Sequence, residues 1–298
     1  MKRTVSGLLG KPGAPNPGAV VGAQSKVYCI LGDERVYVSR SPAMFSTVIA
    51  RQGLDGSYVP FRVAPEDLGA ALQSLRILNV AGANIGVPYK ERVTPLLDVL
   101  SEGAQIIGAV NTIVRVGDQW KGYNTNAIGF MDALNETGFE VEGKRAVVIG
   151  TGGAARAVAF ILNWQRTESL FVVGRNHARA KALAADFGAE PLSLDAFGKS
   201  PPAVDLLINA TSVSSPDESA DLAAWAARLD LPSCSFVVDL NYDRKQNIWL
   251  NFADRRGAPF MDGRRPLAHQ ARRTFALWTG LQVPVEEFLK SLDVGDPA

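Results

Sequence analysis

The sequence predicts an α/β fold with two domains, the second of which is a doubly wound, mostly parallel sheet. Its 298 residues exceed one average domain and therefore predict two domains that share a cleft. Apolar residues form 47% of the chain and charged residues 20%, which is the composition of a globular protein that folds by burial. Short β-branched runs alternate with amphipathic segments, and this order requires right-handed crossovers between parallel strands.

The first half of the chain predicts one α/β domain. Residues 1–25 contain a stretch rich in Pro and Gly, which predicts an extended N-terminal arm without a core of its own. Strands and helices are expected to alternate after this arm. The expected strands are 27–31, 58–63, 80–85, 109–116 and 120–123. Three helices are expected: one that begins after Ser41-Pro42, one at 65–78 and one at about 90–100.

The second half repeats the alternation more regularly and predicts the doubly wound sheet. Its expected strands are 146–149, 170–173, 205–209 and 236–240, with helices at 154–164 and 178–187. Two further helical patterns, 266–278 and 285–292, follow the last strand, and we expect them to cross back to the first domain. The predicted limits are 1–25 for the arm, 26–125 with 263–298 for the first domain and 126–262 for the second.

Charge and cysteine usage exclude several classes of partner. Lys and Arg number 31 against 30 Asp and Glu, so no overall field favours nucleic acid or an anionic membrane. No apolar run has the length of a signal peptide core or a bilayer span, which predicts a cytoplasmic protein. Cys29 and Cys234 lie in apolar runs and are expected to be buried free thiols rather than a disulfide. His177 and His269 are the only histidines, and no metal site is predicted.

A glycine-rich turn follows the first strand of the second half. Gly150, Gly152 and Ala155 form the pattern G-x-G-x-x-A, with Gly153 inside it, between a buried strand and the start of a helix. Glycine lets the backbone approach a pyrophosphate closely, and the N–H groups of the helix start, including that of Ala154, can bind it. The turn therefore predicts a dinucleotide site of the Rossmann type, in preference to a turn with a purely structural role.

The end of the next strand indicates which dinucleotide is bound. No acidic residue follows this strand to bind the ribose hydroxyls of NAD. Arg175, His177 and Arg179 stand there instead, and arginine suits the extra phosphate of NADP. The alternative is a solvated basic helix start, but basic residues there oppose the helix dipole. We therefore expect NADP.

Further short blocks follow one another in the order typical of one enzyme family. They are Ser39-Arg-Ser41-Pro42, Asn84-Ile-Gly-Val-Pro88-Tyr-Lys90, Gly108-Ala-Val-Asn111-Thr112, Ile208-Asn209-Ala-Thr211-Ser212, Asp239-Leu-Asn-Tyr242, and a closing block with Gln270, Phe275 and Trp278-Thr-Gly280. Together with the glycine turn, these blocks make the chain resemble the shikimate dehydrogenase family from about residue 27 to the C-terminus. The resemblance implies an N-terminal α/β substrate domain, a Rossmann-type NADP domain, and reversible reduction of 3-dehydroshikimate to shikimate in aromatic amino acid and chorismate biosynthesis.

The resemblance also assigns roles to single residues. It makes Lys90 the acid/base that exchanges a proton with the substrate oxygen as hydride is transferred. The residues that it implies for binding a cyclic polyhydroxy carboxylate are Ser39, Ser41, Asn111, Tyr242 and Gln270. Asn209, Thr211 and Gly263 join the glycine turn as expected cofactor-binding residues. Each of these residues taken alone can equally be a helix cap, a turn or ordinary surface, the two serines above all.

The chain departs from the family pattern at its expected catalytic pair. Asn126 stands where the family has the aspartate that accompanies the lysine, and an amide can neither take a proton nor hold the lysine's charge. We therefore expect Lys90 to titrate lower than in relatives and turnover on shikimate to be slower. Gly86 and Val38 replace a threonine and a histidine and remove further polar groups from the substrate side.

These departures leave two alternatives open. One is a divergent relative that acts on quinate, an amino-substituted shikimate or another cyclic polyol acid. The other is a paralogue that binds a dinucleotide or a shikimate-like ligand without turnover. The main interpretation and both alternatives predict that the protein binds a small molecule, binds neither nucleic acid nor membrane, and is a monomer or homodimer.

Overall fold

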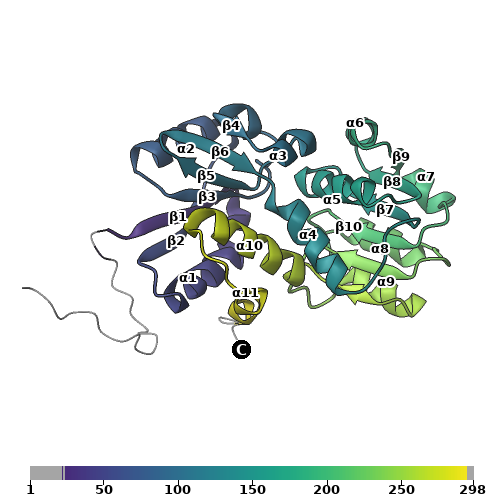
Figure 1. Ribbon diagram of the computed structural model, residues 1–298. Coiled ribbons are helices and arrows are strands. Elements are labelled where there is room, and N and C mark those ends of the chain that lie inside the picture. Colours follow the sequence, from purple (N-terminus) through teal and green to yellow (C-terminus); the bar gives the residue numbers. More distant parts are fainter. Residues whose placement is uncertain (1–21, 23, 294–298) are drawn as a thin grey trace, which may run out of the picture.

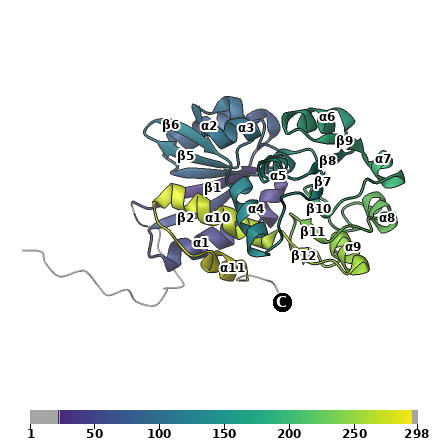
Figure 2. The same ribbon diagram turned by 45° about the vertical axis from the view of Figure 1, so that its right-hand side comes forward.

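The computed structural model describes residue 22 and residues 24–293, so nearly all of the predicted N-terminal arm lies outside the described residues. This part of the chain forms two six-stranded sheets in separate halves, and helices α4 (Thr125–Glu136) and α10 (Arg264–Thr279) pack against each other between them (Figures 1 and 2). The two-part α/β architecture predicted from the sequence is therefore present.

The first sheet is mixed. Its strand order is β2-β1-β3-β5-β6-β4. The strands are β1 (Lys26–Gly32), β2 (Gly56–Arg62), β3 (Gly82–Ile85), β4 (Val99–Leu100), β5 (Thr112–Val116) and β6 (Gln119–Tyr123). β1 runs parallel to β2 and β3, whereas β5 is antiparallel to both β3 and β6. From β1 the chain continues to β2 on one side and then crosses to β3 on the other side of β1. Such a switch point leaves a crevice at the carboxyl ends of the strands.

Helices cover both faces of the first sheet, and β1 is therefore buried on both sides. Its residues Tyr28 and Ile30 pack on α1 (Ser41–Arg51), α10 and α11 (Val285–Leu292), whereas Cys29 and Leu31 pack on α2 (Leu68–Ile77) and α3 (Glu102–Ile107). Successive strand residues point to opposite faces, so a continuous apolar run is what a two-sided core requires. The predicted return of the C-terminal helices to the first half is thereby confirmed.

The second sheet is entirely parallel. Its strand order is β12-β11-β10-β7-β8-β9. The chain runs from β7 through β8 to β9 at one edge, then crosses to β10 on the other side of β7 and continues through β11 to β12. The strands are β7 (Arg145–Ile149), β8 (Ser169–Gly174), β9 (Glu190–Ser193), β10 (Leu206–Asn209), β11 (Phe236–Asp239) and β12 (Phe260–Met261). This is the doubly wound arrangement of the Rossmann fold, with its switch point between β7 and β10.

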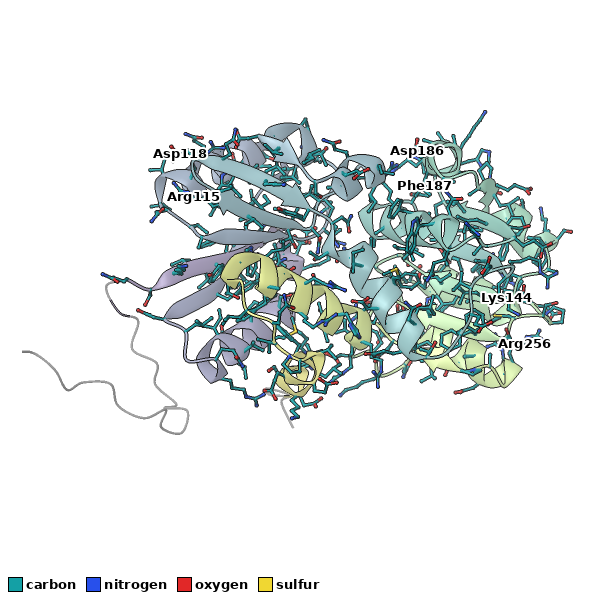
Figure 3. The ribbon with its side chains drawn as sticks, viewed as in Figure 1. Arg115, Asp118, Lys144, Asp186, Phe187 and Arg256 are labelled. Carbon is teal, nitrogen blue, oxygen red and sulfur yellow. The ribbon has the colours of Figure 1, made fainter. Side chains whose placement is uncertain are left out.

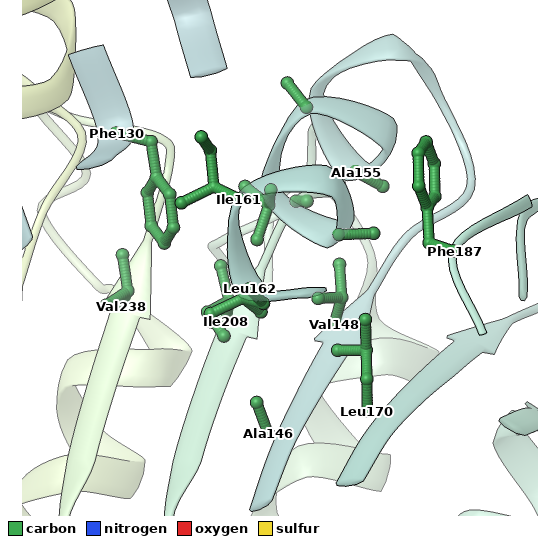
Figure 4. Packing of buried hydrophobic residues seen from close by; sticks show 14 of the residues in the cluster. Phe130, Ala146, Val148, Ala155, Ile161, Leu162, Leu170, Phe187, Ile208 and Val238 are labelled. Atoms are coloured by element: carbon green, nitrogen blue, oxygen red, sulfur yellow. The ribbon is translucent and has the colours of Figure 1, made fainter. Parts of the chain in front are cut away.

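Both faces of the second sheet are also covered. α4, α5 (Gly153–Trp164) and α6 (His177–Asp186) lie on one face, and α7 (Leu194–Lys199), α8 (Ala220–Arg228) and α9 (Ile248–Arg256) on the other. Figure 4 shows Ile161 and Leu162 of α5 over strand residues Val148 and Ile208, with Phe130 of α4 beside them. This packing fixes the start of α5 at the switch point.

Several elements of residues 24–293 were not expected. They include the 3-10 helices η1 (Glu34–Val38) and η3 (Thr94–Leu96), together with α3, α4, α7, α8, α9, β9 and β12. The helix expected at 65–78 is present as the 3-10 helix η2 (Pro65–Asp67) followed by α2. The helix expected at 90–100 is wrong: turns lead to η3, and β4 pairs with β6 instead. Pro95 lacks the N–H that a helix would use, and Val99 and Leu100 find partners at the sheet edge. The strand expected from residue 109 begins only at Thr112.

The periphery carries exposed ion pairs that do not reach the switch points. Arg115 of β5 and Asp118 of the turn that follows are 3.7 Å apart and lie at the end of the first sheet away from the second (Figure 3). Cys29 and Cys234 are buried free thiols, as expected. None of the helices in residues 24–293 combines the length and apolar character needed to cross a bilayer.

Candidate active site

A cavity of about 1090 Å³ lies where the carboxyl ends of the central strands of both sheets meet. Its lining includes Gly86 after β3, Gly150 after β7, Gly174 at the end of β8 and Ala210 after β10. Both switch points therefore open into one cavity, and a ligand bound in it contacts residues from both halves of the chain.

The glycine turn forms one wall of this cavity. Gly150 has a φ of +129°, and a Cβ placed on it would lie 2.8 Å from the Ala210 carbonyl oxygen, so only glycine fits. A Cβ on Gly152 would meet nothing within 4 Å, because this residue faces the open cavity. Gly152 is the N-cap of α5 and supplies no side-chain acceptor, which leaves N–H groups of the first helical turn for a ligand. The turn thus fits a dinucleotide pyrophosphate.

Lys90 reaches this turn from the other half of the chain. A Cβ on Gly153 would lie 2.8 Å from the Cβ of Lys90, so the aliphatic stem of the lysine packs directly on the helix start. The main-chain oxygen of Lys90 accepts a hydrogen bond from the N–H of Val110, which attaches the lysine segment to the chain entering β5. The predicted acid/base and the predicted cofactor turn are therefore in contact.

The environment of Lys90 favours its neutral form. Burial lowers the pKa of its ammonium from the usual range to about 8. The ammonium makes no ion pair or hydrogen bond with any residue that the structure describes. Burial is the cause of this shift, and the lower pKa of Lys90 relative to the lysine of relatives stays a prediction.

An amide network forms the floor of the cavity beside Lys90. The Nδ2 of Asn111 lies 2.8 Å from the Thr125 hydroxyl, 3.0 Å from Asn126 Oδ1 and 3.0 Å from Gln270 Oε1. Asn111 Oδ1 in turn accepts from the N–H of Thr125 at 2.7 Å. Because their oxygens accept from Asn111, Asn126 and Gln270 keep their own NH₂ groups for a ligand. Asn111 itself is placed to orient its neighbours, and its direct contact with substrate stays a prediction.

A second layer of buried hydroxyl and amide groups supports this floor. The Thr274 hydroxyl lies 2.9 Å from that of Thr112 and 3.0 Å from that of Thr125, and Asn84 Nδ2 donates to Thr112 at 3.2 Å. The Tyr58 hydroxyl donates to Asn84 Oδ1 at 2.8 Å. Sequence reasoning missed this layer. The only available signal was that Asn84 and Thr112 belong to the quoted family blocks.

The two serines and Tyr242 meet at another part of the cavity wall. Ser41 begins α1, and its N–H donates to the Ser39 hydroxyl at 3.2 Å. The main-chain N–H of Arg40 donates to the Tyr242 hydroxyl at 3.5 Å, across the two halves of the chain. Burial raises the pKa of Tyr242, so its phenol is neutral at physiological pH. The three hydroxyl groups thus form one neutral, hydrogen-bonding surface.

The basic residues expected to bind the cofactor phosphate line the same cavity. Arg175 and Arg179 are exposed at the start of α6. Arg179 Nη2 donates to Glu91 Oε1 at 2.9 Å and to the Thr151 carbonyl at 3.3 Å. The acidic residue Glu91 was not expected at this end of the cavity. It precedes Arg179 by 88 positions and comes from the other half of the chain.

One expected cofactor-binding residue does not reach the cavity. Asn209 is fully buried, and its Nδ2 donates to the Val213 carbonyl at 3.0 Å and to Asp239 Oδ1 at 2.8 Å. Its position at the end of a central strand turns its side chain into the protein, where it holds the following loop in place. Thr211 in that loop lines the cavity, as does Gly263, where a Cβ would clash with the Leu240 carbonyl oxygen.

Comparison with known proteins identifies the family. Residues 30–113 match the model of the shikimate dehydrogenase substrate binding domain, and residues 133–245 match the shikimate / quinate 5-dehydrogenase model. The chain belongs to the shikimate dehydrogenase family. A shikimate dehydrogenase (NADP(+)) of Desulforamulus reducens is 38% identical over 257 residues, which are 83% of this chain and 88% of the relative.

Solved structures of shikimate dehydrogenases share the fold. The enzyme of Aquifex aeolicus superimposes with a TM-score of 0.81 at 31% identity, covering 92% of this chain and 99% of its own. The enzyme of Thermus thermophilus, solved in complex with NADP(H) and shikimate, has a TM-score of 0.78 at 34% identity, covering 90% and 98%. The predicted family and fold class are confirmed. Asn126 and Gly86, which depart from the expected family pattern, line the same cavity as Lys90.

Proposed function

We propose that this protein is an NADP-dependent shikimate dehydrogenase that reversibly reduces 3-dehydroshikimate to shikimate. The packing of Lys90 on Gly153 supports this function most directly, because it joins a proton donor to the dinucleotide turn within one cavity. The relatives named above carry the same activity in their names, and they do not favour the divergent-substrate or non-catalytic alternatives. The activity belongs to aromatic amino acid and chorismate biosynthesis.

The residues of the cavity fit the cofactor. The N–H groups of Gly152, Gly153 and Ala154 would hold the pyrophosphate, and Gly150 makes room for it. Arg175 and Arg179 would hold the 2′-phosphate of the adenosine ribose. When bound, NADPH supplies the hydride that reaches the carbonyl carbon.

Lys90 supplies the proton that the reaction needs. In the direction of reduction its ammonium donates a proton to the ketone oxygen, which becomes the hydroxyl of the product. In the direction of oxidation the neutral amine accepts that proton. A pKa of about 8 keeps both forms accessible near neutral pH, so one group can serve both directions.

Side chains around Lys90 would orient the substrate. The NH₂ groups of Asn126 and Gln270 would donate to ring hydroxyls, and Ser39, Ser41 and Tyr242 would bind the carboxylate through their hydroxyls. An aspartate in place of Asn126 would offer acceptors instead of donors. This difference supports slower turnover on shikimate rather than its loss.

Oxidation of NADPH in the presence of 3-dehydroshikimate tests the proposal directly. We expect a rate above background that falls about 10²- to 10⁴-fold in Lys90→Met while NADPH binding persists. The absence of any rate in the unaltered protein over hours, with both ligands bound, would instead identify a binding protein. The domain limits, the cytoplasmic location and a monomeric or homodimeric state stay predictions.

A further inference from the structure

An ion pair crosses the cavity at the end expected to receive the 2′-phosphate. Arg179 comes from α6 of the second half, and Glu91 is the residue that follows Lys90 in the first half. Their side chains are 54% and 37% exposed, so water and an incoming ligand reach both. Glu91, Arg175 and Arg179 all line the cavity.

The carboxylate of Glu91 uses a donor that a phosphate would also use. Arg179 Nη2 donates to Glu91 Oε1 at 2.9 Å, and the same nitrogen lies 3.3 Å from the Thr151 carbonyl oxygen. A doubly charged phosphate bound to this guanidinium would therefore lie close to a second anion, which weakens its binding. A carboxylate at this place can instead accept hydrogen bonds from the ribose hydroxyls of a dinucleotide without the extra phosphate.

We propose that Glu91 is a specificity-determining residue that reduces the preference of this enzyme for NADP over NAD. The inference rests on the proposed function, since it assumes that the adenosine end of the cofactor lies beside Arg175 and Arg179. Glu91 lowers the gain that the 2′-phosphate obtains from Arg179 and leaves the contribution of Arg175 in place. Solvent screens both partners, so the effect is a few-fold change and not a switch of cofactor.

The opposite role, in which Glu91 holds Arg179 ready for the phosphate, is less consistent with the contacts. The Thr151 carbonyl, which is part of the glycine turn, already holds the same nitrogen and does not depend on Glu91. Removing the carboxylate therefore leaves the guanidinium at the turn and removes only the competing charge.

The test compares two adenosine probes that differ only in the 2′-phosphate. Dissociation constants for adenosine 2′,5′-bisphosphate and for adenosine 5′-monophosphate are measured by calorimetry on the full chain and on Glu91→Gln, which keeps shape and hydrogen bonding but removes the charge. We expect the preference for the bisphosphate to rise about three- to ten-fold in Glu91→Gln. In an Arg179→Gln background the same change should have a smaller effect, because the competition for Arg179 Nη2 is then absent and only the repulsion between carboxylate and phosphate remains.

Matched controls separate this effect from a general change of charge. Glu66→Gln removes one negative charge from the same half of the chain, outside the cavity lining, and should leave the preference unaltered. An unchanged or reduced preference in Glu91→Gln, with tight binding of the bisphosphate to the unaltered protein, overturns the inference and leaves the proposed function standing. Failure of the unaltered protein to distinguish the two probes overturns both.

Discussion

The two ends of the cavity are built by different means. At the nucleotide end, the main chain of one contiguous turn makes the site, and its requirements are glycine at Gly150 and open space at Gly152. At the substrate end, side chains from β3, α1, α4 and α10 make the site through an amide and hydroxyl network. The first end depends on backbone shape and the second on the identity of many side chains.

This difference explains where the chain can depart from its family. At the nucleotide end, the glycine turn and its N–H donors are present as expected. At the substrate end, the exchange of one acid for Asn126 changes both the hydrogen-bonding direction and the charge next to Lys90. Substitutions can therefore change the ligand that a site made by side chains binds, whereas a site made by the backbone keeps its ligand.

The largest expected effect comes from removing the proposed acid/base, Lys90. Lys90→Met should lower turnover about 10²- to 10⁴-fold, because it removes the ammonium that gives its proton to the ketone oxygen. NADPH binding should change little, since the methionine stem still packs on Gly153. Steady-state rates and cofactor titration measure the two quantities, with Lys199→Met, an exposed lysine of α7, as the control. A rate within a few-fold of the unaltered protein would remove Lys90 from the mechanism.

Two neighbouring glycines distinguish backbone shape from open space at the nucleotide end. Gly150→Ala places a Cβ against Ala210 at a φ that disfavours side chains, and should cost about 1–3 kcal/mol of folding stability along with cofactor binding. Gly152→Ala meets no protein atom, so it should preserve the melting temperature and weaken only cofactor binding. Thermal melts and NADPH titration check both. Equal loss of stability in the two variants would contradict the geometry described for the turn.

The substrate end can be tested through pH. Oxidation of shikimate needs the neutral form of Lys90, so its rate should rise as pH increases through about 8, while the rate of reduction should fall over the same range. Asn126→Asp adds a carboxylate to the cavity, which favours the ammonium and should move both midpoints to higher pH. pH–rate profiles in both directions test this. Identical midpoints in the two proteins would mean that residue 126 does not influence Lys90.

The smallest effect is expected in the layer beneath the amides. Thr274→Val removes a hydroxyl from between Thr112 and Thr125 and should cost about 1–2 kcal/mol of stability with less than a ten-fold loss of rate. Urea unfolding measures the stability. Thr47→Val is the control, because its hydroxyl bonds to no described residue in α1 or its surroundings. Equal effects of the two changes would show that the layer contributes no special support.

Sequence reasoning succeeded where local pattern determines structure. The strand, glycine turn and helix around Gly150 lie in one contiguous segment, so period and residue type were enough to predict them. It failed at residues 90–100, where pairing of Val99 with a distant strand overrode a helical pattern. It also could not bring Glu91 beside Arg179, because contacts between the halves of the chain leave no local signal. Asn209 illustrates the converse: a family motif locates a residue but does not say which way its side chain points.

The crossing of α10 from the second sheet back to the first has a consequence for biosynthesis. Strands β7 to β12 lie in one continuous stretch, 145–261, so the ribosome releases the whole nucleotide sheet as a unit. The first sheet is synthesised earlier, but the core on one of its faces is complete only when Phe275 and Phe288 have been added. The lining of the cavity likewise needs Gln270. The part of the enzyme that is synthesised first is therefore completed last.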